Sequence, residues 1–182
     1  MRDLLLERDF EQIATEEILA RAGVSRGGMY HHFASKVELF RAAYEASERD
    51  AMLRLAAVAE RQAASGAGAF QQLLAGCIAY VRECASPGEL QRIGLRQSRA
   101  VLGWESWREA AAPLGIAALG AGVQVAVDAG ELSSNDVTIT THLLLAMLVE
   151  AGLLAATDPR PAQALAPIEA EITRLLDGLR TP

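Results

Sequence analysis

The chain has 182 residues, of which 51% are hydrophobic, and a formal net charge of −6. This length allows one large domain or two small ones with a real buried core. The first residues include Asp3, Glu7 and Asp9 rather than a basic and then an apolar run, which argues against a signal peptide and predicts a cytoplasmic protein. Helix formers run almost throughout, and no sustained period-2 alternation indicates strands. We therefore expect an all-α fold.

Residues 15–36 contain two short helical patterns separated by a tight glycine-containing turn. Thr15 is placed to cap the first helix, and Gly23 is placed to end it in a left-handed conformation. Ser25 is placed to cap the second helix. Between the two helices, the apolar Val24 is expected to fill the angle that they form. This arrangement predicts a helix-turn-helix unit that binds DNA.

The second helix of such a unit enters the major groove, where its N-terminal residues meet base edges. Met29 and Phe33 are expected to face the protein interior. Gly27 and Gly28 each weaken the helix by roughly 1 kcal/mol relative to alanine, which is understandable if the backbone must lie close to DNA. The residues predicted to read DNA are Arg26, Gly27, Gly28, Tyr30 and His31.

The run AGVSRGGMYHHFASKVELF at residues 22–40 resembles the tetracycline-repressor (TetR) family of transcription regulators. It has that family's turn, its aromatic-ended recognition helix, and the Ser-Lys pair that opens a long connecting helix. The run AVLGWESWRE at residues 100–109 is similar to a segment of the ligand-binding domain in many members. The resemblance implies that Arg26 and Gly27 face the groove and that phosphates or bases are contacted by Thr15, Ser25, Tyr30, His31 and Lys36.

The resemblance also implies the domain organisation. An N-terminal helix-turn-helix head, residues 1–45, is expected to be joined by a long helix to an α-helical ligand-binding and dimerisation domain, residues 46–182. Family members usually have a complete first helix after a basic arm, so the start at Met1 predicts a clipped first helix. Leu19 stands where members more often have a small residue, which predicts a wider crossing of the two helices.

The net charge of −6 does not favour a nucleic-acid partner, but the distribution of charge does. Acidic residues outnumber basic ones in residues 1–20, whereas residues 21–41 carry four Arg or Lys residues and one Glu. Phosphate neutralisation supplies most non-specific affinity for DNA. The predicted partner is therefore a double-stranded DNA operator, with weak background binding elsewhere.

After this unit, a long helix is predicted over residues 36–64 and further helices over 70–85 and 89–101. Cys77 and Cys84 lie seven residues apart on one helix, too far for a disulfide with each other, so we expect two buried thiols. No group of Cys and His residues has the spacing of a zinc site. No metal or other cofactor is predicted.

Catalytic residue sets are not recognisable in the sequence. There is no defensible Ser/His/Asp or Cys/His arrangement and no phosphate-binding glycine loop after a strand. Glu150 is a lone acid in a hydrophobic helix, and its favoured interpretation is a partner for His142, an arginine or water. The chain is not predicted to be an enzyme.

Trp104 and Trp107 lie three residues apart and hence on one face of a predicted helix. They suit a flat apolar wall of a pocket, with Gln97, Arg96 or His142 as polar anchors. Packing in a core or at a dimer contact is the more common role of such tryptophans. The candidate ligand-binding residues are Gln97, Trp104, Trp107 and His142, and the expected effector is an apolar or aromatic small molecule of unknown identity.

The uncharged run at residues 110–127 is interrupted by Pro113 and several glycines, which favours a buried helix or helix pair over a membrane span. Asn135 or Asp136 is placed to cap a further helix that ends near residue 157. This helix is predicted to be buried on more than one side. No membrane partner is predicted.

The last helix, after a proline-containing linker at 158–161, carries an apolar stripe at steps of three and four residues. Two interpretations remain: the stripe covers the chain's own core, or it forms half of a four-helix dimer interface, as the resemblance implies. The residues predicted for a homodimer interface are Leu144, Leu148, Leu165, Ile168, Ile172, Leu175 and Leu179. Two heads roughly 34 to 36 Å apart would then read a near-palindromic site.

The predicted function is a dimeric transcription repressor that a small molecule releases from its operator. The alternative is a TetR-like all-α small-molecule-binding protein that has lost DNA binding. Salt-sensitive binding to DNA separates the two.

Overall fold

The computed structural model describes residues 1–158 and 160–181, without the side chains of 110–112, 161 and 162. These residues form no β-strand, and a single isolated antiparallel bridge joins Leu132 to Arg180. The all-α prediction is confirmed. In chain order the elements are α1 (Arg2–Glu7), the 3-10 helix η1 (Phe10–Gln12), α2 (Thr15–Ala22), α3 (Arg26–His32), α4 (Lys36–Ala64), α5 (Ala69–Ala85), the π-helix η2 (Leu90–Gln97), α6 (Ser98–Leu102), α7 (Trp104–Asp128), α8 (Val137–Thr157) and α9 (Pro161–Asp177).

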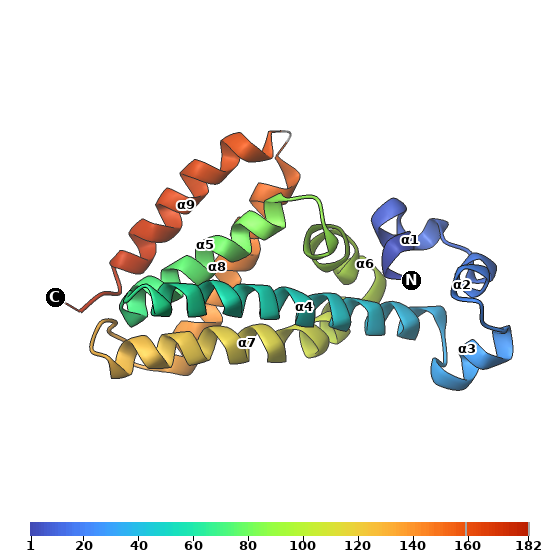
Figure 1. The fold of residues 1–182 in the computed structure, drawn as a ribbon, viewed down its shortest axis with the longest axis horizontal. Coiled ribbons are helices and arrows are strands. Elements are labelled where there is room, and N and C mark those ends of the chain that lie inside the picture. Colours follow the sequence, from blue (N-terminus) through green and yellow to red (C-terminus); the bar gives the residue numbers. More distant parts are fainter. Residues whose placement is uncertain (159, 182) are drawn as a thin grey trace.

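Helix α4 runs along most of the molecule and connects its two parts (Figure 1). The short helices α1 to α3 gather at its N-terminal end, whereas α5 and α7 pack against its other half, α8 packs on α5 and α7, and α9 packs on α5 and α8. With 29 residues, α4 is roughly 43 Å long. It begins where predicted because the Ser35 side chain accepts a hydrogen bond from the Glu38 amide, 3.1 Å away.

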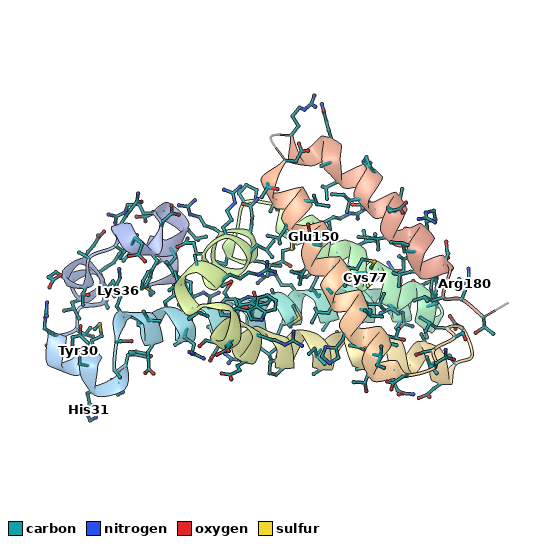
Figure 2. All side chains as sticks on the ribbon, turned by 180° about the vertical axis from the view of Figure 1, so that it is seen from behind. Tyr30, His31, Lys36, Cys77, Glu150 and Arg180 are labelled. Atoms are coloured by element: carbon teal, nitrogen blue, oxygen red, sulfur yellow. The ribbon has the colours of Figure 1, made fainter. Side chains whose placement is uncertain are left out.

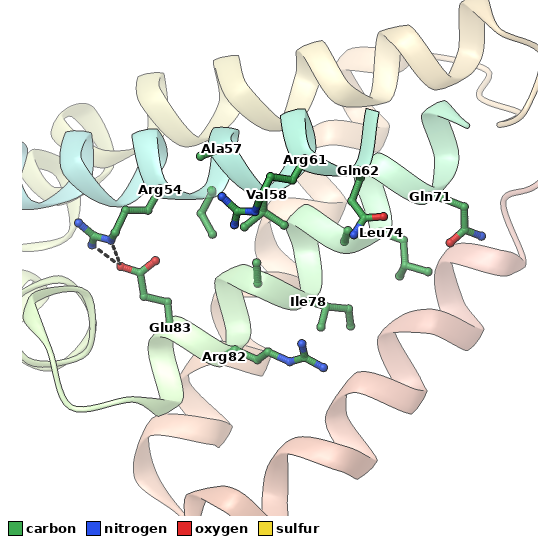
Figure 3. Close-up of a pocket in the computed structure, with 13 residues that line it drawn as sticks. Arg54, Ala57, Val58, Arg61, Gln62, Gln71, Leu74, Ile78, Arg82 and Glu83 are labelled. Carbon is green, nitrogen blue, oxygen red and sulfur yellow. Dashed lines mark hydrogen bonds and ion pairs between the residues drawn. The ribbon is translucent and has the colours of Figure 1, made fainter. Parts of the chain in front are cut away.

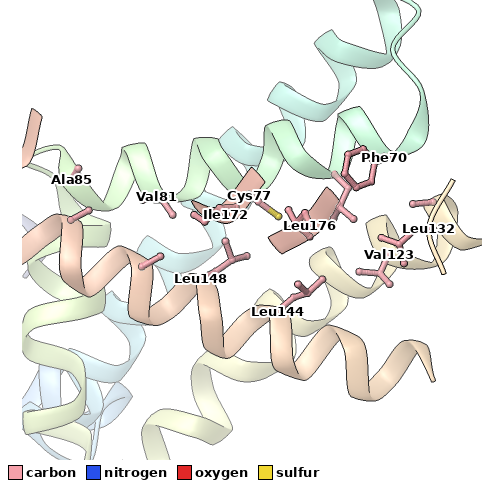
Figure 4. Packing of buried hydrophobic residues seen from close by; sticks show 14 residues of the cluster. Phe70, Cys77, Val81, Ala85, Val123, Leu132, Leu144, Leu148, Ile172 and Leu176 are labelled. Atoms are coloured by element: carbon pink, nitrogen blue, oxygen red, sulfur yellow. The ribbon is translucent and has the colours of Figure 1, made fainter. Parts of the chain in front are cut away.

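The main hydrophobic core lies between α5, α7, α8 and α9 (Figure 4). Phe70 and Val81 of α5 and Ile172 and Leu176 of α9 are almost completely buried in it. Leu165, Ile168 and Leu179 pack against the same cluster. The apolar stripe of the last helix therefore covers the chain's own core.

This packing corrects the predicted dimer residues. Leu144, Leu148 and Ile172 are 6%, 4% and 2% exposed, so a second chain has no access to them. Among the seven residues predicted, Leu175 is the one that the structure classes as exposed. Periodicity identifies an apolar face but does not say whether the surface that covers it belongs to the same chain.

A second cluster joins the N-terminal helices to α4 and η2. Leu4 and Leu5 of α1, Phe10 of η1 and Phe40 of α4 are buried in it. The rings of Phe10 and Phe40 meet edge to face, with centroids 5.2 Å apart. The N-terminal part is thus anchored on α4 by its own small core.

Two predicted helical segments differ in the structure. The helix expected over 89–101 is a π-helix, η2, followed by α6, which ends at Gly103 with a φ of 76°. The run at 110–127 belongs to one continuous helix, α7, which contains Pro113. Among its described side chains only Val123 and Ala126 are buried, so it is not the buried helix that was expected.

Helix α8 is buried on one face, because Ile139, Leu143 and Leu154 are exposed on the other. The prediction of burial on more than one side was therefore wrong for a single chain. Among the described residues, α8 alone is long and apolar enough to span a membrane by length and composition. Its inner face packs in the protein core.

Candidate DNA interface and effector cavity

Helices α2 and α3 form the predicted helix-turn-helix. Gly23 ends α2 in the left-handed region, with a φ of 67°, which an L side chain rarely adopts. The Ser25 hydroxyl accepts a hydrogen bond from the Gly28 amide, 3.0 Å away, and caps α3. The turn and the second cap are therefore where the sequence predicted them.

Two details of this unit differ from the prediction. Ala14, not Thr15, is the N-cap residue of α2, because its extended backbone precedes the first helical turn and its carbonyl accepts from the Glu17 and Ile18 amides. Val24 does not fill the angle between the helices, since it is 46% exposed. Ile18 and Met29 are the buried side chains of α2 and α3.

The outer face of α3 is open to solvent at the end of the molecule (Figure 2). Arg26, Tyr30 and His31 are exposed, and Tyr30 and His31 project from this end, far from Arg180. A side chain at Gly27 would meet nothing within 4 Å. No packing within this chain therefore requires glycine there, which leaves close approach of another molecule as an explanation.

Ion pairs reduce the positive charge that the sequence predicts for the DNA-facing surface. Arg26 pairs with Glu16, and Arg21 pairs with Glu7 at 2.8 Å. Both acids come from the acidic N-terminal residues, which fold back beside the cations of the helix-turn-helix. The positive charge expected at the DNA-facing surface is thus partly neutralised.

Lys36 does not point freely toward a phosphate. Its ammonium donates a hydrogen bond to the Phe10 carbonyl at 2.7 Å and lies 4.0 Å from the centroid of the Phe10 ring. Partial burial lowers the pKa of this ammonium. Lys36 therefore holds η1 against the start of α4, and a role in binding DNA would need it to leave this contact.

Replacing Glu16 with glutamine is expected to strengthen DNA binding. The Arg26 and Glu16 side chains are 61% and 68% exposed, and an exposed ion pair is worth at most about 1 kcal/mol, so a phosphate or base can compete for Arg26. Without the acid, we expect an increase in affinity of about threefold to fivefold at low salt, which shrinks as salt is raised. Fluorescence anisotropy with labelled duplex measures this.

The control for that measurement is Glu60→Gln, which makes the same charge change on the distal part of α4. It should leave DNA affinity unchanged. Equal affinities for wild type and Glu16→Gln would show that Arg26 is not used at the DNA interface.

A cavity of about 820 Å³ lies among α4, α5, α7 and α8, with η2 and α6 at one side. Its walls carry the aromatic rings of Tyr44, Tyr80, Trp104 and Trp107, and the rest is largely Leu, Ala, Gly and Val. The two tryptophan rings lie with centroids 5.3 Å apart. This volume and composition are typical of a pocket for a small organic molecule.

Three of the four predicted ligand-binding residues line the cavity, and the fourth does not. Trp104, Trp107 and His142 line the cavity. Gln97 does not, because its buried amide binds the N-terminal helices instead: Oε1 accepts from the Phe10 amide at 2.9 Å and Nε2 donates to the Leu5 carbonyl at 3.1 Å. Arg96 donates to the Ala156 carbonyl at 2.8 Å and does not line the cavity either.

Sequence reasoning missed Tyr44, Glu48 and Tyr80. Tyr44 and Glu48 are one turn apart on α4 and, with Met52, place one face of this helix along the cavity. Glu48 is one of several acids in a long helix, so nothing in the local sequence distinguishes it. Only the packing of α5 and η2 against α4 partly buries it.

A second hollow is a groove between α4 and α5 (Figure 3). Its floor is apolar, with Val58, Leu74 and Ile78, but Arg54 is paired with Glu83 on its rim. Arg82, which also lines it, binds Glu169 of α9 at 2.7 Å. The groove has no aromatic ring and is a weaker candidate for an effector than the cavity.

Cys77 and Cys84 are free and buried, as predicted. Burial raises the pKa of both thiols to about 12, which keeps them protonated at neutral pH. Because a thiol reacts as the thiolate, these cysteines are in an unreactive form.

Comparison with known proteins gives a consistent result. Residues 2–43 match the family profile "Bacterial regulatory proteins, tetR family", and residues 70–179 match "Tetracyclin repressor-like, C-terminal domain". A crystal structure of a TetR-family transcriptional regulator from Pectobacterium atrosepticum is 27% identical, with a TM-score of 0.82, over 100% of this chain and 90% of its own. No curated protein matches significantly.

Two further structures share the fold at lower identity. A putative transcriptional regulator from Pseudomonas aeruginosa PAO1 is 24% identical, with a TM-score of 0.71, over 97% of this chain and 86% of its own. The reduced form of NemR from E. coli is 22% identical, with a TM-score of 0.67, over 99% of this chain and 92% of its own.

Proposed function

The chain belongs to the TetR family of bacterial transcriptional regulators, and from this premise we propose that it is a dimeric repressor that an effector in the cavity releases from DNA. The head is residues 1–45, and the effector and dimer domain is residues 46–182. The protein acts in the cytoplasm. The observation that carries the proposal is the solvent-exposed α3, capped by Ser25 and oriented by the Gly23 turn, on a chain matched by both family profiles.

DNA binding is assigned to the exposed face of α3. Arg26, Tyr30 and His31 supply a guanidinium, a phenol and an imidazole that can reach base edges or phosphates. Gly27 allows the backbone to approach the groove, and Thr15 and Ser25 lie at the helix N-termini, where backbone amides bind phosphate. At position 28 the fold itself also favours glycine, since a Cβ there would lie 3.3 Å from the Ser25 hydroxyl oxygen.

The dimer is assigned to the outward face of α8. Ile139, Leu143 and Leu154 lie on this face and are more than half exposed, and Leu175 of the neighbouring α9 is also exposed. Exposed apolar side chains in this number on adjacent helices favour a protein interface, and a second copy of the chain covers them in a closed two-fold arrangement. Two heads then bind two half-sites about one turn of DNA apart.

Release of the repressor from DNA follows from an equilibrium between two states of the dimer. The effector binds more tightly to the state in which the spacing of the two heads does not match the operator. The effect of the ligand cannot exceed its differential affinity for the two states. To shift the ratio of the two states from 1:99 to 99:1, the binding free energies of the effector for the two states must differ by roughly 5.5 kcal/mol. The η2 helix is suited to transmit the change, because Gly94 and Leu95 line the cavity while Gln97 binds α1 and η1.

Binding of the purified protein to its own upstream DNA, measured by fluorescence anisotropy at two salt concentrations, tests the proposal. We expect nanomolar affinity that falls with salt, and at least a tenfold loss in the Arg26→Ala/Tyr30→Phe double variant, since one good base contact is worth about 1–3 kcal/mol. Arg61→Ala, on the distal part of α4, is the matched control for loss of an arginine. Sedimentation of the same sample should give the mass of two chains.

The second candidate function is a ligand-binding protein without DNA activity. The observation in its favour is the pairing of Arg21 and Arg26 with acids, which reduces the positive charge of the head. Wild-type protein that binds no duplex at either salt concentration, while its cavity still takes up ligands, would support this candidate and contradict the repressor.

A further inference from the structure

We propose that the cavity binds an aromatic or apolar organic cation, whose charge pairs with the Glu48 carboxylate and whose body packs against Tyr44, Tyr80 and the two tryptophans. The inference rests on the proposed function in one respect: the cavity is taken to be the effector site. It adds the chemical class of the effector, which the sequence leaves open.

The Glu48 carboxylate lies in the wall of the cavity, beside η2, and is partly buried. It lies against η2 so closely that a Cβ at Gly94 would be 2.7 Å from its Oε1. Glycine at position 94 therefore makes room for the carboxylate. Burial, with a smaller contribution from Glu83, raises the pKa of Glu48 to about 7.

No partner among the described residues compensates this charge. The structure gives the Glu48 carboxylate no hydrogen bond or ion pair there. The nearest acid, Glu83, takes the guanidinium of Arg54, with Nε 2.9 Å from Oε1. Glu48 is only partly exposed, so its carboxylate is incompletely solvated, and a cation bound beside it reduces the cost of that partial desolvation.

Aromatic rings surround the space in front of Glu48. Tyr44 precedes it by one helical turn on α4. Burial is the main reason that the pKa of Tyr80 on α5 is raised, and the charge of Glu48 is near enough to contribute. Trp107 lines the side formed by α7, and Trp104, which is 59% exposed, lies at the more open end of the same side. The faces of such rings attract cations, and the attraction increases when the cation is desolvated. A carboxylate and aromatic faces thus select the same sign of charge.

The other charged groups of the cavity do not reverse this selection. Arg99 lies over the Trp107 ring, with its guanidinium carbon 4.4 Å from the centroid. Cys77 is buried, and its raised pKa keeps the thiol uncharged at neutral pH. Glu60, Arg108, His142 and Glu150, which also line the cavity, are solvent-exposed. Water screens charges at such positions. An anionic ligand held by Arg99 or Arg108 would bring a second negative charge into the cavity that contains Glu48.

Three probes of equal length test the inference: 4-phenylbutylamine, 4-phenylbutan-1-ol and 4-phenylbutyrate, which carry a positive, zero and negative charge. Both tryptophans of the chain lie at the cavity, so intrinsic fluorescence reports its occupancy. We expect the wild type to bind the amine about tenfold more tightly than the alcohol, and the anion most weakly. Glu48→Gln should reduce the preference for the amine to less than about twofold while retaining the alcohol.

Glu60→Gln is the matched control, because it removes a carboxylate from the exposed part of the same lining. It should keep the wild-type preference. Affinity for the amine should rise between about pH 6 and pH 8 in the wild type, because Glu48 must lose its proton to pair with the cation, and should be nearly flat in Glu48→Gln. The titratable groups near enough to interact with the charge of Glu48 are Tyr44, Tyr80, Glu83 and Cys84. Arg99 lines the same cavity, and His142→Gln controls for its imidazole.

Equal binding of amine and alcohol, or tightest binding of the anion, would overturn the inference. So would an unchanged amine preference in Glu48→Gln, with circular dichroism showing that the variant is folded. No binding of any probe by a protein that still binds its operator would reject the cation site and leave the repressor intact. Amine binding without operator binding would support the cation site and reject the repressor.

Discussion

Gln97→Leu is expected to lower the free energy of unfolding by about 1–3 kcal/mol, the usual cost of leaving a buried donor unsatisfied. The donor is the Phe10 amide, whose hydrogen bond to Gln97 Oε1 is buried. The Leu5 carbonyl loses Nε2 of Gln97 but keeps Nε of Arg92, 2.9 Å away, so it is not left without a donor. Leucine preserves most of the side-chain volume, so the loss reports the polar contact. Chemical denaturation followed by circular dichroism measures it.

The functional consequence should exceed the loss of stability. Gln97 is the last residue of η2, and Phe10 also accepts from Lys36 and packs on Phe40. Without Gln97, η2 and the helix-turn-helix are joined less firmly. We expect the variant to keep cavity binding while its operator affinity responds less to ligand. Gln91→Leu, on the same π-helix, is the control and should change neither property.

Gly152→Val is expected to destabilise the protein by about 1–3 kcal/mol or more, because it overpacks a filled contact between α8 and α5. A Cβ at Gly152 would lie 2.9 Å from the Cys84 sulfur, 3.3 Å from the Cys84 Cβ and 3.4 Å from the Tyr80 ring. Both Gly152 and Cys84 are buried, so neither helix can move aside without disturbing the core. Thermal and denaturant unfolding give the size of the effect.

A matched control for this substitution is Gly76→Ala on α5, where a Cβ meets nothing within 4 Å. It should stabilise the chain by about 1 kcal/mol through helix propensity. Cys84→Ala combined with Gly152→Val should recover part of the loss, since the two side chains compete for one space. Additive effects of the two substitutions would show that the clash is not with Cys84.

Local signals in the sequence determined the helix-turn-helix. Gly23 takes the left-handed conformation and Ser25 caps α3, both as predicted, and Ser35 caps α4 at the predicted start of the long helix. These features depend on a residue and its neighbours within one turn, so the information is present in a short run of sequence. The same run carries the family resemblance that both profiles confirm.

Tertiary structure decided the partners of the site residues. Gln97 was predicted as a ligand anchor but binds Phe10, 87 positions away. Arg26 was predicted to be free for DNA but pairs with Glu16. Hydrogen bonds and ion pairs between separate helices depend on how those helices are placed, which the local pattern does not encode.

The sequence by itself determined the all-α class, the turn at Gly23, the Ser25 cap of α3 and the presence of one short helix-turn-helix unit, because propensity, capping and periodicity act within a few residues. Only the tertiary structure decided that the stripe of α9 covers the chain's own core while Ile139 and Leu143 of α8 remain outside. It also placed Glu48, partly buried, in the wall of a cavity that Tyr44, Tyr80 and Trp107 line as well. Burial and desolvation are properties of the assembled helices, and a residue acquires them only when segments far apart in sequence close around it.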